Sequence, residues 1–255
     1  MPERAENPLD WDSALYESRH GFVAQYGKAL LDFIAPDPRQ TILDLGCGTG
    51  NLNAELATRA GSVLGVDASA SMVERARRHF PQLDFQVRDA LELPFENRFD
   101  IVFSNAVFHW IPDHECLLGV IHRALKPHGR LVCEFGAAGN VGTIREAFAR
   151  ACAEAGLDCT TRFTFPEAPA FCRLLAKQGF TPDEVISYAR PTTLQGGDAG
   201  LRTWLRQFFA AELAALPEKR QTALFRRVEA LTRDRLWNGN AWVADYQRLR
   251  VRAHI

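Results

Sequence analysis

The chain has 255 residues, of which 47% are hydrophobic and 24% charged, as is typical of one elaborated globular domain. Its formal net charge of −1 gives no general attraction for phosphate backbones or anionic lipid, so we expect neither a nucleic acid nor a membrane partner. No apolar run approaches the roughly 20 residues that span a bilayer, and the first residues lack the apolar segment of a secretory leader. We therefore expect a cytoplasmic protein.

The six cysteines and seven histidines are scattered along the chain. No C-x-x-C motif occurs, and no spacing of Cys, His and carboxylate residues is typical of a metal site. We expect isolated thiols and no bound metal.

Strand and helix patterns alternate along the chain. A helical pattern over residues 20–34 ends at two prolines, and apolar runs follow at 41–45, 62–67, 83–89, 99–104 and 130–135. Helical patterns at 53–59, 72–79 and 115–125 separate them. This alternation predicts a parallel sheet with both faces covered by helices. Beyond it we expect helices at 144–155, 171–178, 201–213 and 218–235, and strands at 182–190 and 241–253.

The stretch LDLGCGTGNL, residues 43–52, joins the first strand to a helix through Gly46, Gly48 and Gly50. We interpret the missing side chains as room for a ligand that lies against the backbone near the helix N-terminus. The G-x-G-x-G spacing differs from the G-x-G-x-x-G of dinucleotide sites, which argues against an NAD-dependent oxidoreductase. Asp44, just before the turn, would repel a pyrophosphate but suits a cation.

Two more acidic residues follow strands. Asp67 ends the second strand, where a carboxylate can accept both hydroxyls of a ribose. Asp89 ends the third, next to Ala90, where it can accept a hydrogen bond from an exocyclic amine. Taken alone, Asp67 is equally consistent with a helix cap and Asp89 with a solvated turn. Together with Asp44, they favour a cationic adenosine derivative as ligand.

This set resembles the class I S-adenosylmethionine-dependent methyltransferases. The resemblance rests on LDLGCGTGNL, VLGVDASASMVERAR, VRDALELPF, FDIVFSNAVFHWIPD and ALKPHGRLV, which occur in the family's order over residues 40–136. It implies an α/β, Rossmann-like sheet of seven mostly parallel strands, the last antiparallel, with helices on both faces and a helical insert between strands six and seven. It also implies methyl transfer from S-adenosylmethionine, with S-adenosylhomocysteine as product.

The resemblance also implies a cofactor site. The glycine turn would line the methionine moiety, Asp67 would hold the ribose, Asp89 with Ala90 would read the adenine edge, and Asn105 would border the sulfonium. The full expected set is Tyr16, Asp44, Gly46, Cys47, Gly48, Gly50, Asp67, Ala68, Met72, Asp89, Ala90 and Asn105.

The N-terminal DWDSALYESRHGFVAQYGKALL and the FHWIPDH stretch are similar to small-molecule methyltransferases of the trans-aconitate methyltransferase type. We expect a lid segment and helix at residues 1–38, a core at 39–255 and a helical cap at about 195–237. The expected acceptor is a small molecule, methylated on an oxygen of a carboxylic acid or hydroxyl. A carrier-bound acyl group and a non-catalytic S-adenosylmethionine-binding domain remain alternatives, and no oligomeric state is predicted.

A carboxylate acceptor needs no general base, whereas a hydroxyl can use one, with His20 and His109 as candidates. Aromatic and basic residues near the lid, the loop after the fourth strand and the cap are candidates to contact the acceptor. These are Trp11, Arg19, Phe108, Trp110 and Trp204, with Arg190 and Arg202 as further candidate clamps for an anion. The SNAVFHW stretch lacks the Asn/Asp-Pro-Pro-aromatic motif of amine-methylating enzymes, which argues against DNA as substrate.

Overall fold

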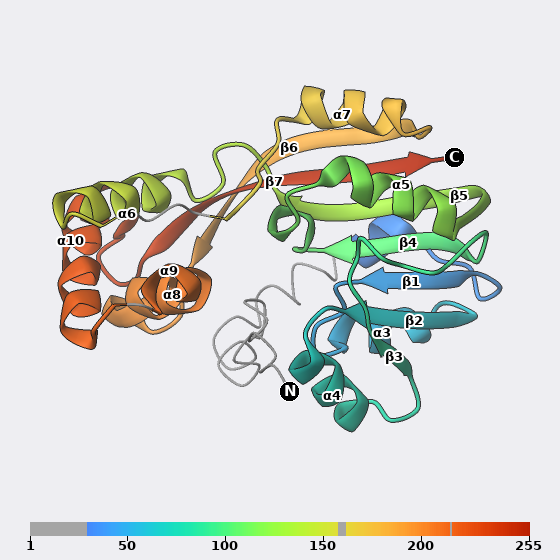
Figure 1. Cartoon of the computed structure of the whole chain (residues 1–255), viewed down its shortest axis with the longest axis horizontal. Coiled ribbons are helices and arrows are strands. Elements are labelled where there is room, and N and C mark those ends of the chain that lie inside the picture. Colours follow the sequence, from blue (N-terminus) through green and yellow to red (C-terminus); the bar gives the residue numbers. More distant parts are fainter. Residues whose placement is uncertain (1–29, 158–161, 215) are drawn as a thin grey trace, which may run out of the picture.

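The computed structural model describes residues 30–157, 162–214 and 216–255. Within them the chain forms a seven-stranded sheet in the order β3-β2-β1-β4-β5-β7-β6 (Figure 1). Strands β1 to β5 are parallel, whereas β7 runs antiparallel to both β5 and β6, which confirms the predicted fold class. The strands are β1 Thr41–Leu45, β2 Ser62–Asp67, β3 Asp84–Val87, β4 Phe99–Asn105, β5 Leu125–Gly136, β6 Thr181–Thr193 and β7 Val243–His254.

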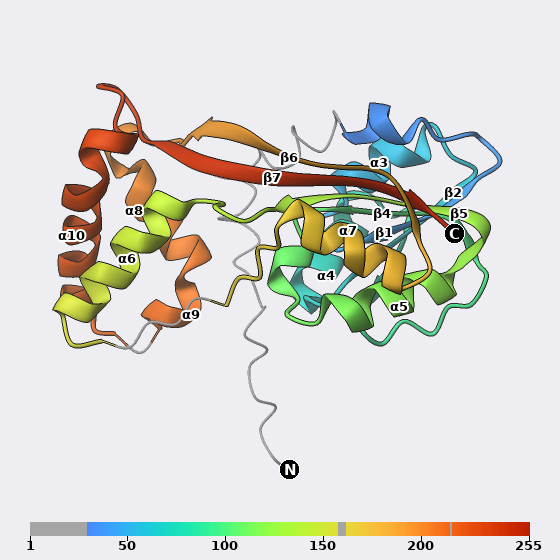
Figure 2. The same cartoon turned by 90° about the horizontal axis from the view of Figure 1, so that it is seen from above.

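Helices cover both faces of this sheet. The helices are α3 Asn51–Ala57, α4 Ala70–His79, α5 His114–Ala124, α6 Gly142–Glu154, α7 Ala168–Lys177, α8 Gly200–Phe208, α9 Ala210–Leu213 and α10 Glu218–Leu236, with 3-10 turns at η1 Phe108–Trp110 and η2 Gly197–Ala199. Side chains cap two of them, because Ser69 accepts from the Met72 N–H at 3.3 Å and Asp113 from the Cys116 N–H at 2.8 Å. In Figure 2, α5 and α7 lie on one side of the sheet and α3 on the other.

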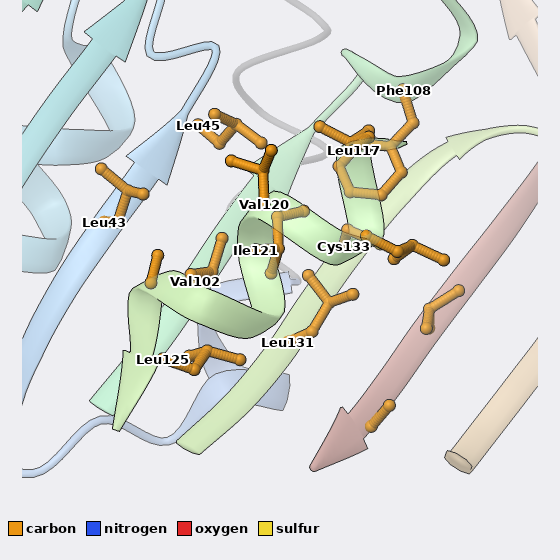
Figure 3. Packing of buried hydrophobic residues seen from close by; sticks show 14 of the residues in the cluster. Leu43, Leu45, Val102, Phe108, Leu117, Val120, Ile121, Leu125, Leu131 and Cys133 are labelled. Atoms are coloured by element: carbon orange, nitrogen blue, oxygen red, sulfur yellow. The ribbon is translucent and has the colours of Figure 1, made fainter. Parts of the chain in front are cut away.

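The central strands are buried on both faces, as parallel strands in a doubly covered sheet must be. On one face Leu43, Val102 and Leu131 pack with Leu117 and Ile121 of α5 (Figure 3). On the other, alternate residues of the same strands pack against residues 30–34 and α3. The strands therefore end in fixed positions at one edge of the sheet.

A second hydrophobic cluster lies beyond that edge. It combines α6, α8 and α10 with the first half of β7, and its buried residues include Phe148, Trp204, Phe225 and Trp242. Strands β6 and β7 run without a break from this cluster to the sheet (Figure 1). The arrowheads of β1 and β4 point toward the side on which these helices lie, so the carboxyl edge of the sheet faces them.

Some element boundaries differ from the sequence predictions. Strand β3 ends at Val87, two residues before Asp89, and the helix expected at 201–213 is divided into α8 and α9. Cys47, Cys116, Cys133 and Cys172 are free, but Cys152 is disulfide-bonded, so the expectation of isolated thiols is wrong at that position. In the part of the chain that is described, no helix is both long and apolar enough to cross a membrane.

Candidate active site

A cavity of about 170 Å³ opens at the carboxyl ends of β1, β2 and β4, beside the glycine turn. We call it the glycine-turn cavity. The position is the one favoured for ligands in open α/β sheets, because the strand order reverses between β1 and β4. Its lining residues are Leu45, Gly46, Gly48, Val66, Asp67, Ala68, Met72, Arg88, Asp89, Ala90, Asn105, Ala106, Val107, Trp110 and Ile111.

The three glycines of the turn have different roles. All have positive φ, at 79° for Gly46, 54° for Gly48 and 83° for Gly50, a conformation in which other residues are strained. A Cβ on Gly48 would meet no atom within 4 Å, so only this glycine faces open space. A Cβ on Gly46 would lie 2.1 Å from a Val107 methyl, and one on Gly50 would lie 2.7 Å from the Phe85 ring. The protein's own side chains therefore account for two of the three glycines.

Asp67 holds the turn in place. Its Oδ2 accepts from the Gly48 N–H at 2.9 Å, and its Oδ1 accepts from the Ser69 N–H at 2.9 Å. Burial raises the pKa of Asp67, although these two backbone hydrogen bonds act in the opposite direction. Since each carboxylate oxygen has two acceptor positions, Asp67 still offers one on each oxygen to a ligand.

Asp44 lies beneath the turn and not in the cavity wall. It is 2% exposed, and burial, together with repulsion from Asp67, raises its pKa to about 8. With its amide turned so that Nδ2 faces the carboxyl, Asn53 donates to Asp44 at 2.7 Å. Asp44 therefore does not line the glycine-turn cavity, its predicted contact with a ligand stays a prediction, and its charge state is coupled to that of Asp67.

Two other predicted lining residues face the interior. Cys47 packs with Val73, Ala76 and Phe85, and burial raises the pKa of its thiol. Gly50 faces Phe85 from the same side. Neither lines the cavity, because both face the cluster around Phe85 on the inner side of the turn. Gly46, Gly48, Asp67, Ala68, Met72, Asp89, Ala90 and Asn105 do line it.

The remaining polar wall comes from the loop after β3. Asp89 is exposed, and its Oδ1 accepts from the Leu91 N–H at 2.9 Å. Among the described residues its Oδ2 has no hydrogen-bond partner, which leaves it available to a donor on a ligand. The neighbouring Arg88 was not predicted, although it directly precedes Asp89 in the motif.

A second, smaller cavity of about 40 Å³ lies between the sheet and the helices of the second hydrophobic cluster. We call it the aromatic chamber. Trp110 lies 4.8 Å from the Phe163 ring centroid, and Trp204 donates from Nε1 to the Tyr246 hydroxyl at 2.7 Å. Ala106 and Trp110 line both cavities. The chamber's lining residues are Ala106, His109, Trp110, Asn140, Val141, Phe163, Phe165, Trp204, Phe208, Tyr246 and Arg248.

His109 lines this chamber as a neutral ring. Burial lowers its pKa well below the usual value, and Arg248 and His114 lower it further. Its Nδ1 accepts from the Gly136 N–H at 3.3 Å, so the ring proton is on Nε2. A ring in this state donates a hydrogen bond, which does not fit the predicted role as general base.

Three other predicted acceptor contacts lie elsewhere. Phe108 is fully buried beside Leu117, in the hydrophobic cluster between the sheet and α5 (Figure 3). Arg202 pairs with Glu229 at 2.5 Å, and Arg190 pairs with Glu134. None of the three lines either cavity. Trp11, Tyr16, Arg19 and His20 lie outside the described residues, so their roles stay predictions.

Within the described ranges, no group of three His, Cys, Asp or Glu side chains is placed to hold a metal ion.

Comparison with known proteins identifies the family. Residues 43–133 match the family described as "Methyltransferase domain". An uncharacterized methyltransferase of Schizosaccharomyces pombe, C70.08c, is 30% identical over 96% of this chain and 97% of its own. The chain belongs to the class I S-adenosylmethionine-dependent methyltransferases.

Two further matches agree with this. Trans-aconitate 2-methyltransferase of Deinococcus radiodurans is 31% identical over 78% of this chain and 80% of its own. The structure of geranyl diphosphate C-methyltransferase from Streptomyces coelicolor, which contains Mg²⁺, geranyl diphosphate and S-adenosyl-L-homocysteine, has a TM-score of 0.55 at 18% identity, over 91% of this chain and 77% of that one. The likeness to the Streptomyces structure shows the fold alone. The enzyme is thus a methyltransferase with S-adenosylmethionine as methyl donor.

The glycine-turn cavity fits this cofactor. Gly48 leaves open space where a side chain would stand, Asp67 and Asp89 present carboxyl groups in the wall, and Asp44 lies buried beneath the turn.

Proposed function

We propose that the enzyme methylates an oxygen of a small organic acid or alcohol held in the aromatic chamber. The observation that carries this proposal is that Ala106 and Trp110 line both cavities. An acceptor in the chamber is therefore adjacent to a cofactor in the glycine-turn cavity. The aromatic walls of the chamber favour an acceptor with an apolar body, and its volume of about 40 Å³ restricts how much of the acceptor enters it.

We assign the cofactor contacts to the residues that line the glycine-turn cavity. Asp67 holds the ribose through its remaining acceptor positions, and Asp89 with Ala90 receives the adenine edge. Gly46 and Gly48 receive the methionine moiety, and Asn105 borders the sulfonium. When bound, S-adenosylmethionine supplies an electrophilic methyl group, so that an acceptor oxygen lone pair forms the new C–O bond while the C–S electron pair stays on sulfur.

The protein's own contribution is positioning and the exclusion of water. Trp110 separates the two cavities, and Phe163, Phe165 and Phe208 enclose the acceptor side. A positioned acceptor gains an effective molarity that reaches the order of 10⁵ M. A carboxylate oxygen has no proton to lose, which agrees with a neutral His109 that serves as donor.

The name of the Deinococcus relative supports the carboxylic acid over the alcohol. We also propose that residues 1–38 act as a lid and that α6 joins α8 to α10 in the cap.

The test is methyl transfer from isotopically labelled S-adenosylmethionine to a panel of small carboxylic acids, alcohols and one malonyl-carrier protein, with products identified by mass spectrometry. We expect methyl esters. Methylation of the carrier-bound acyl group alone would contradict the proposal, as would no O-methyl product from any acceptor in the panel.

A further inference from the structure

Arg248 of β7 is a buried cation in the wall of the aromatic chamber. It is 5% exposed, and among the described residues its Nε has no hydrogen-bond partner. Within the described residues it forms no ion pair. Its guanidinium lies over an aromatic face and not beside a carboxylate, at 4.6 Å from the Tyr246 ring centroid. A buried guanidinium in this state lacks the compensation that such groups normally have.

The sheet face around Arg248 has more positive than negative groups. Register pairs Glu134 of β5 with Arg250 and pairs Tyr246 with Arg190, so these side chains share the face with Arg248. Glu134 is the acidic residue of this group, and it is fully engaged. It accepts from Tyr188 at 2.5 Å, from Arg250 at 2.9 Å and from Arg190. Glu134 is thus already paired with the guanidiniums of Arg190 and Arg250, and Arg248 has no carboxylate of its own among the described residues.

Asn140 provides a second polar group in the same wall. It is 3% exposed, and its Oδ1 accepts from the Gln247 N–H at 3.0 Å, which fixes the amide. Its Nδ2 is then directed away from Gln247 and has no partner among the described residues. His109 adds the Nε2–H of its neutral ring. The polar groups without partners in this chamber are therefore donors, as an anionic ligand requires.

We propose that Arg248 binds a carboxylate of the acceptor and thereby determines which acceptors the enzyme takes. This inference rests on the proposed function. Arg248 lines the chamber and not the glycine-turn cavity, so the carboxylate it binds is not the oxygen that receives the methyl group. The acceptor keeps this carboxylate after methylation, and its apolar body packs among Phe163, Phe165, Trp204 and Phe208.

The test uses the full-length enzyme saturated with S-adenosylhomocysteine. Calorimetry measures the binding of benzoate, cinnamate and hexanoate, with cinnamamide as the neutral counterpart and inorganic phosphate as an anion without an apolar body. The variants are Arg248→Gln, Arg248→Lys and the control Arg252→Gln. Arg252 lies on the same strand, is partly exposed and is 4.0 Å from Asp183.

We expect at least one of the three carboxylates to bind the wild type and Arg248→Gln to weaken that binding about 10- to 100-fold, the range for hydrogen bonds to charged groups. Arg248→Lys, which keeps the charge without the planar fork, falls between. Arg252→Gln and all affinities for S-adenosylhomocysteine stay unchanged. No binding by any of the three carboxylates, equal binding by Arg248→Gln, or phosphate binding as tight as theirs overturns the inference.

Steady-state kinetics separate this inference from the proposed function. With an acceptor that the panel identifies, Arg248→Gln should raise KM at least 10-fold with little change in kcat, because the carboxylate contact is the same in ground and transition states. An O-methyl product formed with unchanged KM overturns the role of Arg248 and leaves the proposed function standing. Carboxylate binding through Arg248 without any O-methyl product overturns the proposed function and leaves the role of Arg248 in carboxylate binding standing.

Discussion

Asp67 accepts a hydrogen bond from the backbone of Gly48 at 2.9 Å, so the residue that ends β2 fixes the turn that follows β1. The same carboxylate is proposed to hold the ribose. Asp67→Ala should therefore weaken the binding of S-adenosylhomocysteine by about 1.5–3 kcal/mol, measured by calorimetry. Asp113→Ala is the control, because Asp113 also accepts a backbone N–H but caps α5 away from the cavity. If a folded Asp67→Ala variant binds S-adenosylhomocysteine as tightly as the wild type, the assignment of Asp67 to the ribose is wrong.

Gly48→Ala tests whether the cofactor lies against the turn. Gly48 and Gly156 both have positive φ, at 54° and 68°, and a Cβ on either meets no protein atom within 4 Å. Both substitutions should lower stability by a similar amount, on the order of 1 kcal/mol, but only Gly48→Ala should weaken cofactor binding, by at least 10-fold. Thermal unfolding and calorimetry measure the two effects. Unchanged binding in Gly48→Ala would show that the cofactor does not approach this backbone.

The carboxyl group of Asp44 predicts a link between cofactor binding and pH. Burial raises its pKa to about 8, so between roughly pH 4 and 8 the folded protein keeps a proton that the unfolded chain releases. The contribution of the protonated Asp44 to the free energy of unfolding is therefore fully present below about pH 4 and is lost as pH rises to about 8. A bound cation favours the ionised form, so affinity for S-adenosylmethionine should rise from pH 6 to 8.

Calorimetry in two buffers of different ionisation enthalpy measures how many protons are released when the cofactor binds. We expect this number to approach one per cofactor near pH 7. Asp44→Asn should reduce it, and S-adenosylhomocysteine, which lacks the sulfonium charge, should release fewer protons from the wild type. The same release from Asp44→Asn as from the wild type would rule out Asp44 as the source.

His109 should act as a donor and not as a base. Burial lowers its pKa well below the usual value, and its Nδ1 accepts from Gly136. We expect kcat to show no inflection between pH 6 and 7.5, and His109→Gln, which can donate through Nε2, to retain kcat within about 10-fold, because general base catalysis typically contributes 10²- to 10⁴-fold. A larger loss, with an inflection that disappears in the variant, would restore the role of general base.

Much of the fold was predictable because its signals are local. The strands β1, β2 and β4 are marked by apolar runs, Asp67 ends β2 as predicted, and β4 ends at Asn105, one residue beyond the predicted run. Asp89 is two residues beyond the end of β3, but its loop still brings it to the same edge. Positions near strand ends are fixed by the parallel sheet itself, so a motif read along the chain places these residues correctly.

Residue orientation within the turn was not predictable in the same way. Cys47 and Gly50 are adjacent to lining residues in sequence, but Phe85 of β3 and α4 determine which way they face. Phe108 likewise belongs to the motif of the site loop, whereas contacts with Phe135 and Phe171 place it in the core. The direction in which each of these residues faces therefore depends on strands and helices that are distant in the sequence.

Arg248 was missed for a related reason. Its place opposite Gly136 follows from the antiparallel register of β7 with β5, which no local pattern gives. A signal was nevertheless present, because arginine occupies alternate positions 248, 250 and 252 of a strand in which the intervening residues are apolar. Charge at every second position of a central strand indicates that one face meets polar partners or a ligand.

Strand β7 belongs to two hydrophobic cores at once. Ala244 and Tyr246 lie in the second hydrophobic cluster with α6, α8 and α10, whereas Leu249, Val251 and Ala253 lie in the cluster between the sheet and α5. The cap therefore cannot melt as an independent unit without loosening the pairing that also closes the sheet, and the two parts should unfold in a single cooperative transition. Arg248 lies on this strand between the two cores. Acceptor selectivity in this enzyme is consequently a property of the globally folded state, sensitive to destabilising changes far from either cavity.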